Sequence, residues 1–287
     1  MAQDPRSTAA KFLLMEIHRS RVNGLSWIQR VFIDRADLYL EIMNSTWSEG
    51  EQIARSIAEI LRENGLESGR VLEAFCGNGR VAIPLAIEGY EVLGFDISLP
   101  FIQDARQKAE KHRVSDKAKF IVSDAREIDS RLKGEIFDAI IIVSTSLGYY
   151  DSMTDEEILR KLRSLVREGS VLIIANTFHR ETPSWSCGRV FQRYGSLVLM
   201  EDMKFDPLWS RLLSKWILLR DDGEGNLTKE LEVNTEMRIY TSTELAEILR
   251  RAGWGVDSIY GDIRKKEKFS PPCPYLSLIA KAIQATK

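Results

Sequence analysis

Residues 71–98 contain the feature that most constrains this chain, a glycine turn between two apolar runs that each carry an acid near their end. The first run carries Glu73, the turn carries Gly77 and Gly79, and the second run ends at Asp96. Glycine lets the chain turn sharply from strand to helix and lets a ligand approach the backbone. A carboxylate at the tip of the next strand can accept hydrogen bonds from both hydroxyls of a ribose. The pattern therefore predicts a strand, a turn, a helix and a strand that bind an adenosine-containing cofactor.

The glycines alone leave two kinds of cofactor open, because their spacing also fits the dinucleotide fingerprint of NAD enzymes. Glu73 favours S-adenosylmethionine, since a carboxylate repels a pyrophosphate and attracts a cationic methionine group. A further acid, Asp124, ends the next apolar run and is followed by Ala125, where the two residues can hydrogen-bond an adenine. Three acids at successive strand ends favour the methyl donor.

Strand and helix signals alternate along most of the chain. Capping-box patterns at Ser48, Thr154 and Thr241 each precede a segment whose apolar residues have helical spacing. Strands that alternate with helices form a parallel sheet covered on both faces. We therefore predict the α/β class, with a Rossmann-like, doubly wound and mostly parallel seven-stranded sheet that ends in an antiparallel C-terminal hairpin.

These features resemble a class I S-adenosylmethionine-dependent methyltransferase of the small-molecule type, over residues 48–283. In that family an acid-x-Gly-x-Gly-x-Gly turn holds the methionine part of the cofactor, and acids ending the second and third strands hold the ribose and the adenine. The matching positions in this sequence are Glu73, Gly77, Gly79, Asp96 and Asp124. Phe75 departs from the pattern, because it stands where the first glycine is usual, so we expect a less open turn.

The resemblance implies S-adenosylmethionine as the cofactor and a binding site made of the glycine turn, the strand ends and the loop after the fourth strand. The predicted cofactor-binding residues are Glu73, Phe75, Gly77, Asn78, Gly79, Asp96, Ile97, Asp124, Ala125, Ser144, Thr145 and Leu147. No spacing of cysteine and histidine typical of metal ligands is present, so no metal is predicted.

Three residues are candidates for the catalytic side of the site. Tyr149 and Tyr150 follow the fourth predicted strand, where they face the expected place of the transferred methyl group. Either ring can position an acceptor or contact a sulfonium by a cation–π interaction, and packing of the loop is the simpler alternative. His179 follows the fifth strand and is the best placed of three histidines to take a proton, although an exposed loop histidine is the simpler interpretation.

Two regions fall outside the alternating pattern. The insert 178–240 contains β-rich runs separated by polar turns, which predicts an antiparallel β-meander. It begins at the carboxyl edge of the sheet, where it can cover the cofactor. We divide the chain into an N-terminal cap segment 1–47, a methyltransferase core of 48–177 and 241–287, and this inserted β cap.

Net charge and the absence of certain motifs narrow the classes of molecule that this protein is expected to bind. The formal net charge is −2 and the isoelectric point is near 6.1, so no global field attracts nucleic acid or an anionic membrane. The sequence lacks the Asn-Pro-Pro-Tyr and Pro-Cys motifs of DNA-base methylation. An apolar N-terminal run that would indicate export is also missing, which predicts a cytoplasmic protein.

The sequence thus predicts transfer of a methyl group to nitrogen or oxygen of a small molecule by in-line displacement, with DNA excluded and RNA disfavoured. An RNA or protein methyltransferase is the alternative enzyme. A non-catalytic regulatory protein that binds the cofactor is the alternative of another class, since no general base is evident.

Overall fold

The computed structural model describes residues 27–181 and 187–284, so positions 1–26 of the predicted N-terminal cap segment lie outside the described residues. Seven strands form the central sheet in the spatial order β10-β11-β5-β4-β1-β2-β3. Strands β1 to β5 are parallel, whereas β11 is antiparallel to both of its neighbours. The bounds are β1 (Arg70–Ala74), β2 (Glu91–Asp96), β3 (Ala118–Val122), β4 (Phe137–Val143), β5 (Val166–Thr177), β10 (Trp254–Tyr260) and β11 (Leu276–Ala282). The predicted fold class and its C-terminal hairpin are confirmed.

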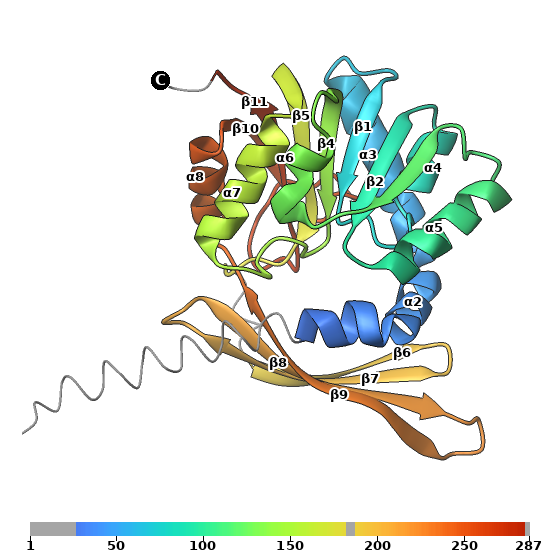
Figure 1. Cartoon of the computed structure of the whole chain (residues 1–287). Coiled ribbons are helices and arrows are strands. Elements are labelled where there is room, and N and C mark those ends of the chain that lie inside the picture. Colours follow the sequence, from blue (N-terminus) through green and yellow to red (C-terminus); the bar gives the residue numbers. More distant parts are fainter. Residues whose placement is uncertain (1–26, 182–186, 285–287) are drawn as a thin grey trace, which may run out of the picture.

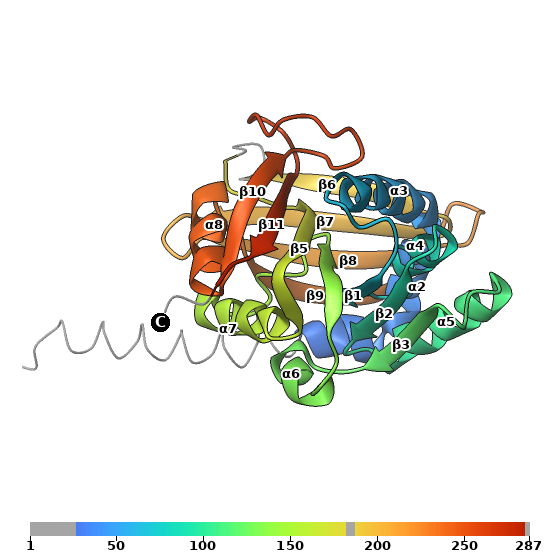
Figure 2. The same ribbon diagram turned by 90° about the horizontal axis from the view of Figure 1, so that it is seen from above.

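Helices cover both faces of this sheet (Figure 1 and Figure 2). Successive strand residues alternate between the two layers, so that Val71 packs with α3, α4 and α5, and Leu72 packs with α6, α7 and α8. The bounds are α3 (Trp47–Glu63), α4 (Ala82–Ile87), α5 (Leu99–Lys111), α6 (Ile128–Arg131), α7 (Ser152–Arg163) and α8 (Ser242–Arg251), with a short 3₁₀ turn η2 (Ala125–Glu127) before α6. Sheet and helices therefore bury two separate apolar layers.

Of the three predicted capping boxes, only the one at Thr241 is formed, with Glu244 as its reciprocal partner. Helix α7 begins three residues earlier than predicted, because the Asp151 carboxylate accepts a hydrogen bond from the Thr154 amide at 2.9 Å. Helix α3 begins at Trp47, directly after a turn, and has no side-chain cap. The predictions at Ser48 and Thr154 were therefore wrong, because an earlier part of the chain already supplies partners for the first amides.

A separate antiparallel sheet has the order β6-β7-β8-β9. The bounds are β6 (Cys187–Tyr194), β7 (Leu197–Asp206), β8 (Arg211–Asp221) and β9 (Leu227–Arg238). The predicted antiparallel β-meander is present as β7, β8 and β9, and β6 adds a further strand at one edge. β6 pairs only with β7 and forms an edge of the sheet, and its sequence, Cys-Gly-Arg-Val-Phe-Gln-Arg-Tyr, does not alternate strictly between apolar and polar residues. A strand of this kind lacks the alternation on which sequence prediction depends.

The N-terminal helices lie between the two sheets, as Figure 1 shows for α2. A turn of π-helix, η1 (Gln29–Asp34), leads into α2 (Ala36–Ser45). Phe32 and Leu38 of this segment share one apolar cluster with Leu199 and Leu231 of the antiparallel sheet and with Phe101 of α5. This packing holds the segment against the carboxyl ends of the parallel strands. Within the described residues, none of the helices combines the length and apolar character needed to cross a bilayer.

Candidate active site

A pocket opens at the carboxyl ends of the parallel strands, where the strand order reverses between β1 and β4. Ligands of doubly wound sheets bind at such a switch point. The pocket has a volume of about 900 Å³, the solvent space at its mouth included. Strand-end residues line one side, and the N-terminal segment lines the other with Ile28, Phe32, Tyr39 and Met43.

The glycine turn forms the floor of the pocket. Gly77 has a φ of 54°, and a Cβ at this position would lie 2.8 Å from the Met43 sulfur. Phe75 has a φ of 58°, in the left-handed region that normally favours glycine. Its ring lines the pocket and packs against Phe95 at 5.9 Å between centroids. The turn therefore keeps a left-handed backbone at Phe75 despite the departure from the family pattern.

Asp96 ends β2 and lines the pocket. One carboxylate oxygen accepts a hydrogen bond from the Gly77 amide at 2.9 Å, and the other accepts one from the Ser98 amide at 3.0 Å. Burial raises the pKa of Asp96, and these amides oppose the rise. Because a carboxylate offers about four lone-pair sites, the side chain can still accept hydrogen bonds from a ribose.

Glu73 is the buried acid of the site, with 3% of its surface exposed. The Ala82 amide hydrogen-bonds the carboxyl group, yet Oε2 is buried and has no partner in the described residues. Burial raises the pKa of Glu73 to about 8, Arg80 opposes that rise and Asp96 adds to it. An unpartnered acid oxygen in a pocket is a site for a cationic group, so the residues present fit the ammonium of a methionine moiety.

The predicted adenine end lies beside β3. Asp124 and Ala125 line the pocket, as does Tyr150. The Asp124 carboxylate pairs with the Arg126 guanidinium at 2.5 Å, which holds the pKa of Asp124 below its usual range. Arg126 also lies over the Tyr150 ring, 5.0 Å from its centroid. The acid is therefore fixed in place and remains ionised at neutral pH.

The structure brings most of the predicted cofactor residues to the pocket and leaves four outside its lining. Those in the lining are Glu73, Phe75, Gly77, Asp96, Ile97, Asp124, Ala125 and Ser144. Leu147 is buried in the core, and the Thr145 hydroxyl accepts a hydrogen bond from the Phe178 amide. Asn78 is fully buried and donates to Asn44, while a Cβ at Gly79 would meet the Phe120 ring.

Both candidate tyrosines line the pocket. The Tyr149 ring contacts the Trp27 ring edge-on, with centroids 5.4 Å apart, and lies 5.8 Å from the Phe32 ring. Burial raises the pKa of Tyr149 well above its usual value, so its hydroxyl stays protonated and can donate a hydrogen bond. The tyrosine is therefore suited to hold a ligand and unsuited to take a proton at neutral pH.

The loop that carries these tyrosines is clamped to the end of β9. Gly148 has a φ of 100° and its carbonyl accepts a hydrogen bond from the Arg238 amide at 2.7 Å. Nearby, the buried Tyr240 hydroxyl donates to Asp155 of α7 at 2.5 Å. The inserted sheet is thus hydrogen-bonded to the pocket loop, and the Tyr240 hydroxyl fixes the end of the insert against α7.

We expect Gly148→Ala to destabilise the protein by about 2–4 kcal/mol, because the new Cβ would lie 2.1 Å from the Arg238 carbonyl oxygen in a left-handed backbone. Gly134→Ala is the matched control, since Gly134 has a φ of 89° and nothing within 4 Å of a Cβ. Urea unfolding of both variants measures the difference. Equal losses would show that the clamp contributes nothing beyond the backbone strain.

His179 lies outside the pocket lining and is fully buried. Its Nε2 lies 2.8 Å from the Cys273 carbonyl and its Nδ1 lies 2.9 Å from a Glu181 carboxylate oxygen. The expectation of an exposed loop position is therefore wrong, because both ring nitrogens have partners in the interior. These contacts tie the chain after β5 to the segment before β11 and leave no ring nitrogen directed at the pocket.

Sequence reasoning missed two sets of pocket residues. The first is Arg80, the basic residue directly after the glycine turn, which lines the pocket. Its position in the turn was a readable signal. The second set lies in the N-terminal segment, which was predicted as a cap, although its pocket residues Ile28, Phe32 and Met43 were not identified. No local motif identifies those residues, because only packing against the antiparallel sheet places them there.

Comparison with known proteins finds similar methyltransferases. Residues 66–205 match the methyltransferase-domain family. A putative methyltransferase of Bacillus subtilis is 27% identical over 209 residues, which are 70% of this chain and 79% of that protein. The tRNA 5-carboxymethoxyuridine methyltransferase of Escherichia coli is 33% identical over 118 residues, but the match covers only 41% of this chain and 44% of that enzyme.

Two solved structures share the fold. The CcbJ methyltransferase from Streptomyces caelestis has a TM-score of 0.70 at 22% identity, with 82% of this chain and 90% of that chain covered. CalS10 from Micromonospora echinaspora, an amino pentose methyltransferase solved with S-adenosylmethionine bound, has a TM-score of 0.60 at 15% identity, with 80% and 89% covered. The fold and the family match, which spans about half of the chain, together support a class I S-adenosylmethionine-dependent methyltransferase.

Proposed function

We propose that this enzyme methylates a nitrogen or oxygen atom of a small molecule. The observation that carries the proposal is the cover over the pocket. Phe32 and Tyr39 of the N-terminal segment line the pocket, and the antiparallel sheet packs behind them in one apolar cluster. An acceptor must therefore enter a chamber with aromatic walls, which suits a compact molecule.

The comparisons include an enzyme that supports a small-molecule acceptor and an enzyme that acts on the alternative acceptor, tRNA. CalS10, which shares the fold over most of the chain, is an amino pentose methyltransferase. The Escherichia coli relative acts on tRNA, but its similarity covers less than half of each protein. Because the amino pentose enzyme matches 80% of this chain and the tRNA enzyme matches 41%, we favour a small-molecule acceptor.

The chain's own residues can bind and orient the cofactor and the acceptor, and they can exclude water from the pocket. When bound, S-adenosylmethionine would supply a methyl group on a sulfonium, and in-line attack on that methyl by the acceptor releases a neutral thioether. Asp96 would hold the ribose, Glu73 the ammonium, and the aromatic walls would keep water from the reacting atoms. No histidine is among the lining residues described, and Tyr149 stays protonated. This chemistry favours an amine that binds in its neutral form over a hydroxyl that needs a base.

A radiolabelled methyl-transfer assay tests the proposal. The purified enzyme is offered pools of small amines, amino sugars and hydroxylated compounds, and total tRNA in parallel. We expect label in the amine pool and none in tRNA at any ionic strength. Label in tRNA alone, with a rate that falls steeply as salt rises, would establish the nucleic-acid enzyme instead.

We expect Tyr149→Phe to lower kcat at least about 10-fold, because the hydroxyl that positions the acceptor is lost. Its unfolding free energy should stay within about 0.5 kcal/mol, since no hydrogen bond of this hydroxyl is found in the described part of the chain. Met153→Leu, a change at an exposed side chain, is the control. Unchanged turnover would show that Tyr149 only packs the loop.

A further inference from the structure

The inserted sheet carries a single charge on the face that packs against the N-terminal segment, its inner face. Side chains alternate between the two faces of a strand, and Leu199 and Met203 of β7 belong to the apolar cluster of this face. Glu201 lies between them in the same alternation and therefore also faces inward. Only Glu201 is charged among the alternate positions of the inner face, which run through 197–205 of β7, 212–218 of β8 and 231–237 of β9.

Two aromatic rings connect this carboxylate with the cofactor pocket. Trp216, opposite Glu201 on β8, donates its indole N–H to Glu201 Oε1 at 2.8 Å. The Trp216 ring stacks on the ring of Tyr39 with centroids 6.4 Å apart and an interplanar angle of 1°, and Tyr39 lines the pocket. Burial raises the pKa of Tyr39, and Arg80 opposes that rise. Asp96 and Glu201 both add to it, so the Tyr39 hydroxyl is within electrostatic reach of the pocket and of the inserted sheet.

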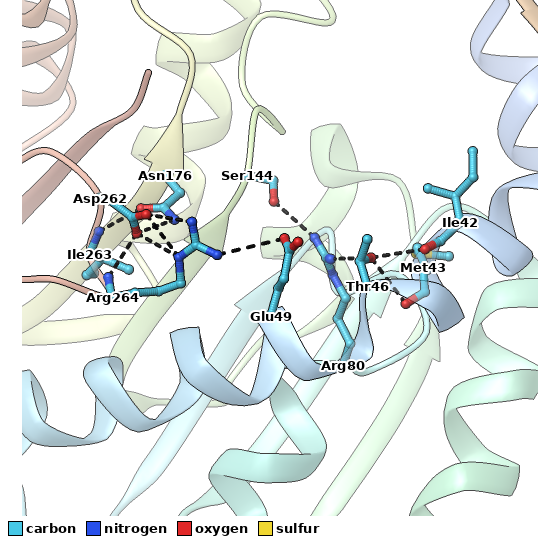
Figure 3. Close-up of polar contacts among 10 residues, drawn as sticks. All are labelled: Ile42, Met43, Thr46, Glu49, Arg80, Ser144, Asn176, Asp262, Ile263 and Arg264. Carbon is cyan, nitrogen blue, oxygen red and sulfur yellow. Dashed lines mark hydrogen bonds and ion pairs between the residues drawn. The ribbon is translucent and has the colours of Figure 1, made fainter. Parts of the chain in front are cut away.

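No cation in the described parts of the chain balances Glu201. Its carboxylate belongs to no ion pair there, and its one hydrogen bond comes from the indole. Arg220, at the end of the same face, already pairs with an acid of α2 at 2.6 Å. Arg80, the only basic residue of the described pocket lining, is directed toward the Thr46 and Ser144 hydroxyls, as Figure 3 shows. A half-buried carboxylate without a counter-charge is unfavourable, and a cationic ligand would remove that imbalance.

The surroundings of Glu201 suit an organic cation. Tyr39, Trp216 and Tyr194 of β6 are all half-buried, so their rings are partly open to a ligand. Burial raises the pKa of Tyr194 to about 12, and Glu201 is among the groups that add to the rise. Aromatic rings beside a carboxylate attract an ammonium by cation–π contact as well as by charge. A metal ion needs several acid, cysteine or histidine ligands, and no such group of three exists in the described residues.

We propose that Glu201 receives a positively charged amine of the acceptor, at a place separate from the atom that is methylated. The inference rests on the proposed function and narrows its acceptor to a compact molecule that carries an ammonium besides its reacting group. Tyr39 and Trp216 would form the wall along which such a molecule extends from the pocket to the acid. Because Glu201 lies outside the pocket lining, the reacting group can still bind in its neutral form.

Calorimetric titration of the enzyme saturated with S-adenosylhomocysteine tests the assignment. The two probes are trans-4-aminocyclohexanol and trans-1,4-cyclohexanediol, which differ only in that a hydroxyl replaces the amine. We expect the amino alcohol to bind at least about 10-fold more tightly than the diol. Glu201→Gln should abolish this preference and leave the affinities for the diol and for S-adenosylhomocysteine within about twofold, because the amide keeps an oxygen for the Trp216 N–H and loses only the charge.

Asp202→Asn is the matched control. Asp202 is the next residue of the same strand, faces the opposite side of the sheet, is exposed and pairs with Arg189 at 3.2 Å. Its substitution removes one carboxylate from the same strand without touching the inner face. The preference for the amino alcohol over the diol should therefore stay within about twofold of the wild type.

Four results would overturn the assignment. Equal affinities of the wild type for the two probes, or no binding of either, would mean that no cation site exists on the inner face. A preference that survives Glu201→Gln would place the cation at another acid, and equal losses for both probes would mean that Glu201 only shapes the wall. These titrations involve no methyl transfer. A failed titration together with label in the amine pool would therefore refute the role of Glu201 alone, whereas label only in tRNA would refute the proposed function.

Discussion

Asp96→Ala is expected to weaken S-adenosylmethionine by at least about 100-fold, the larger of two losses that we foresee in the cofactor pocket. The variant would lose the carboxylate placed to accept from the ribose hydroxyls. It would also lose the acceptors for the Gly77 and Ser98 amides, which lie 2.9 and 3.0 Å from the Asp96 oxygens. The glycine turn would then be free to move away from the ligand.

Calorimetric titration measures this effect, and Asp96→Asn separates its two parts. Asparagine keeps one oxygen that can accept from an amide, so we expect it to retain part of the turn and to lose the charge-assisted bonds to the ribose. Asp116→Ala, a change at an exposed position before β3, is the control and should bind as the wild type does. An affinity for Asp96→Ala within threefold of the wild type would refute the assignment of the ribose site.

Glu73→Gln is expected to weaken S-adenosylmethionine by about 10- to 100-fold, because an amide cannot balance an ammonium. The pKa of Glu73 is raised to about 8, so at pH 7 most of the population of the free enzyme carries a protonated carboxyl. Pairing with an ammonium favours the ionised form, and binding should therefore release a large fraction of one proton at pH 7. Titration in buffers of different ionisation enthalpy measures that proton, and Glu73→Gln should release none.

The same variant should be more stable than the wild type at alkaline pH. In the folded protein the pKa of Glu73 is raised from 4.5 to about 8, so the unfolded chain loses this proton more readily than the folded protein does. This group therefore lowers the free energy of unfolding as pH rises through that window. The difference between Glu73→Gln and the wild type should grow by about 1.4 kcal/mol per pH unit there and level off above it.

Urea unfolding at pH 5, 7 and 9 tests the stability of the Glu73 variant. Glu91→Gln removes a carboxyl from an exposed position on the next strand and is the matched control. Its difference from the wild type should not change with pH. If the two glutamine variants behaved alike, the buried carboxyl of Glu73 would carry no desolvation cost, and the case for a cation site at its free oxygen would fall.

The parts of this protein that sequence patterns predicted are those encoded locally. Strands, glycine turns and acids at strand ends follow from residue order alone, because alternation and turn chemistry are properties of neighbours in the chain. Glu73, Gly77, Asp96 and Asp124 were found in this way, and the structure places all four around one pocket. The capping box at Thr241 was local too, and it is formed.

Where sequence prediction was wrong, a distant or competing partner decided the outcome. Asp151 caps α7 because its side chain accepts a hydrogen bond from the Thr154 amide, and the capping-box pattern did not identify it. His179 looked like a surface histidine, and the Cys273 carbonyl, from a segment far along the chain, holds it in the interior. Competition between possible caps and burial by remote segments both depend on the assembled fold.

The sequence by itself determined the class of fold, the cofactor and the acids that surround it, because each depends on short-range order and on the chemistry of single side chains. The sequence also indicated which segments cover the pocket, but only the tertiary structure decided which of their residues line it and what its charges face. Tyr39 meets the strand ends because the antiparallel sheet packs behind it, and Arg80 faces the hydroxyls of Thr46 and Ser144, which come from two distant segments of the chain. Burial and charge balance are sums over the whole assembly, and no local segment contains them.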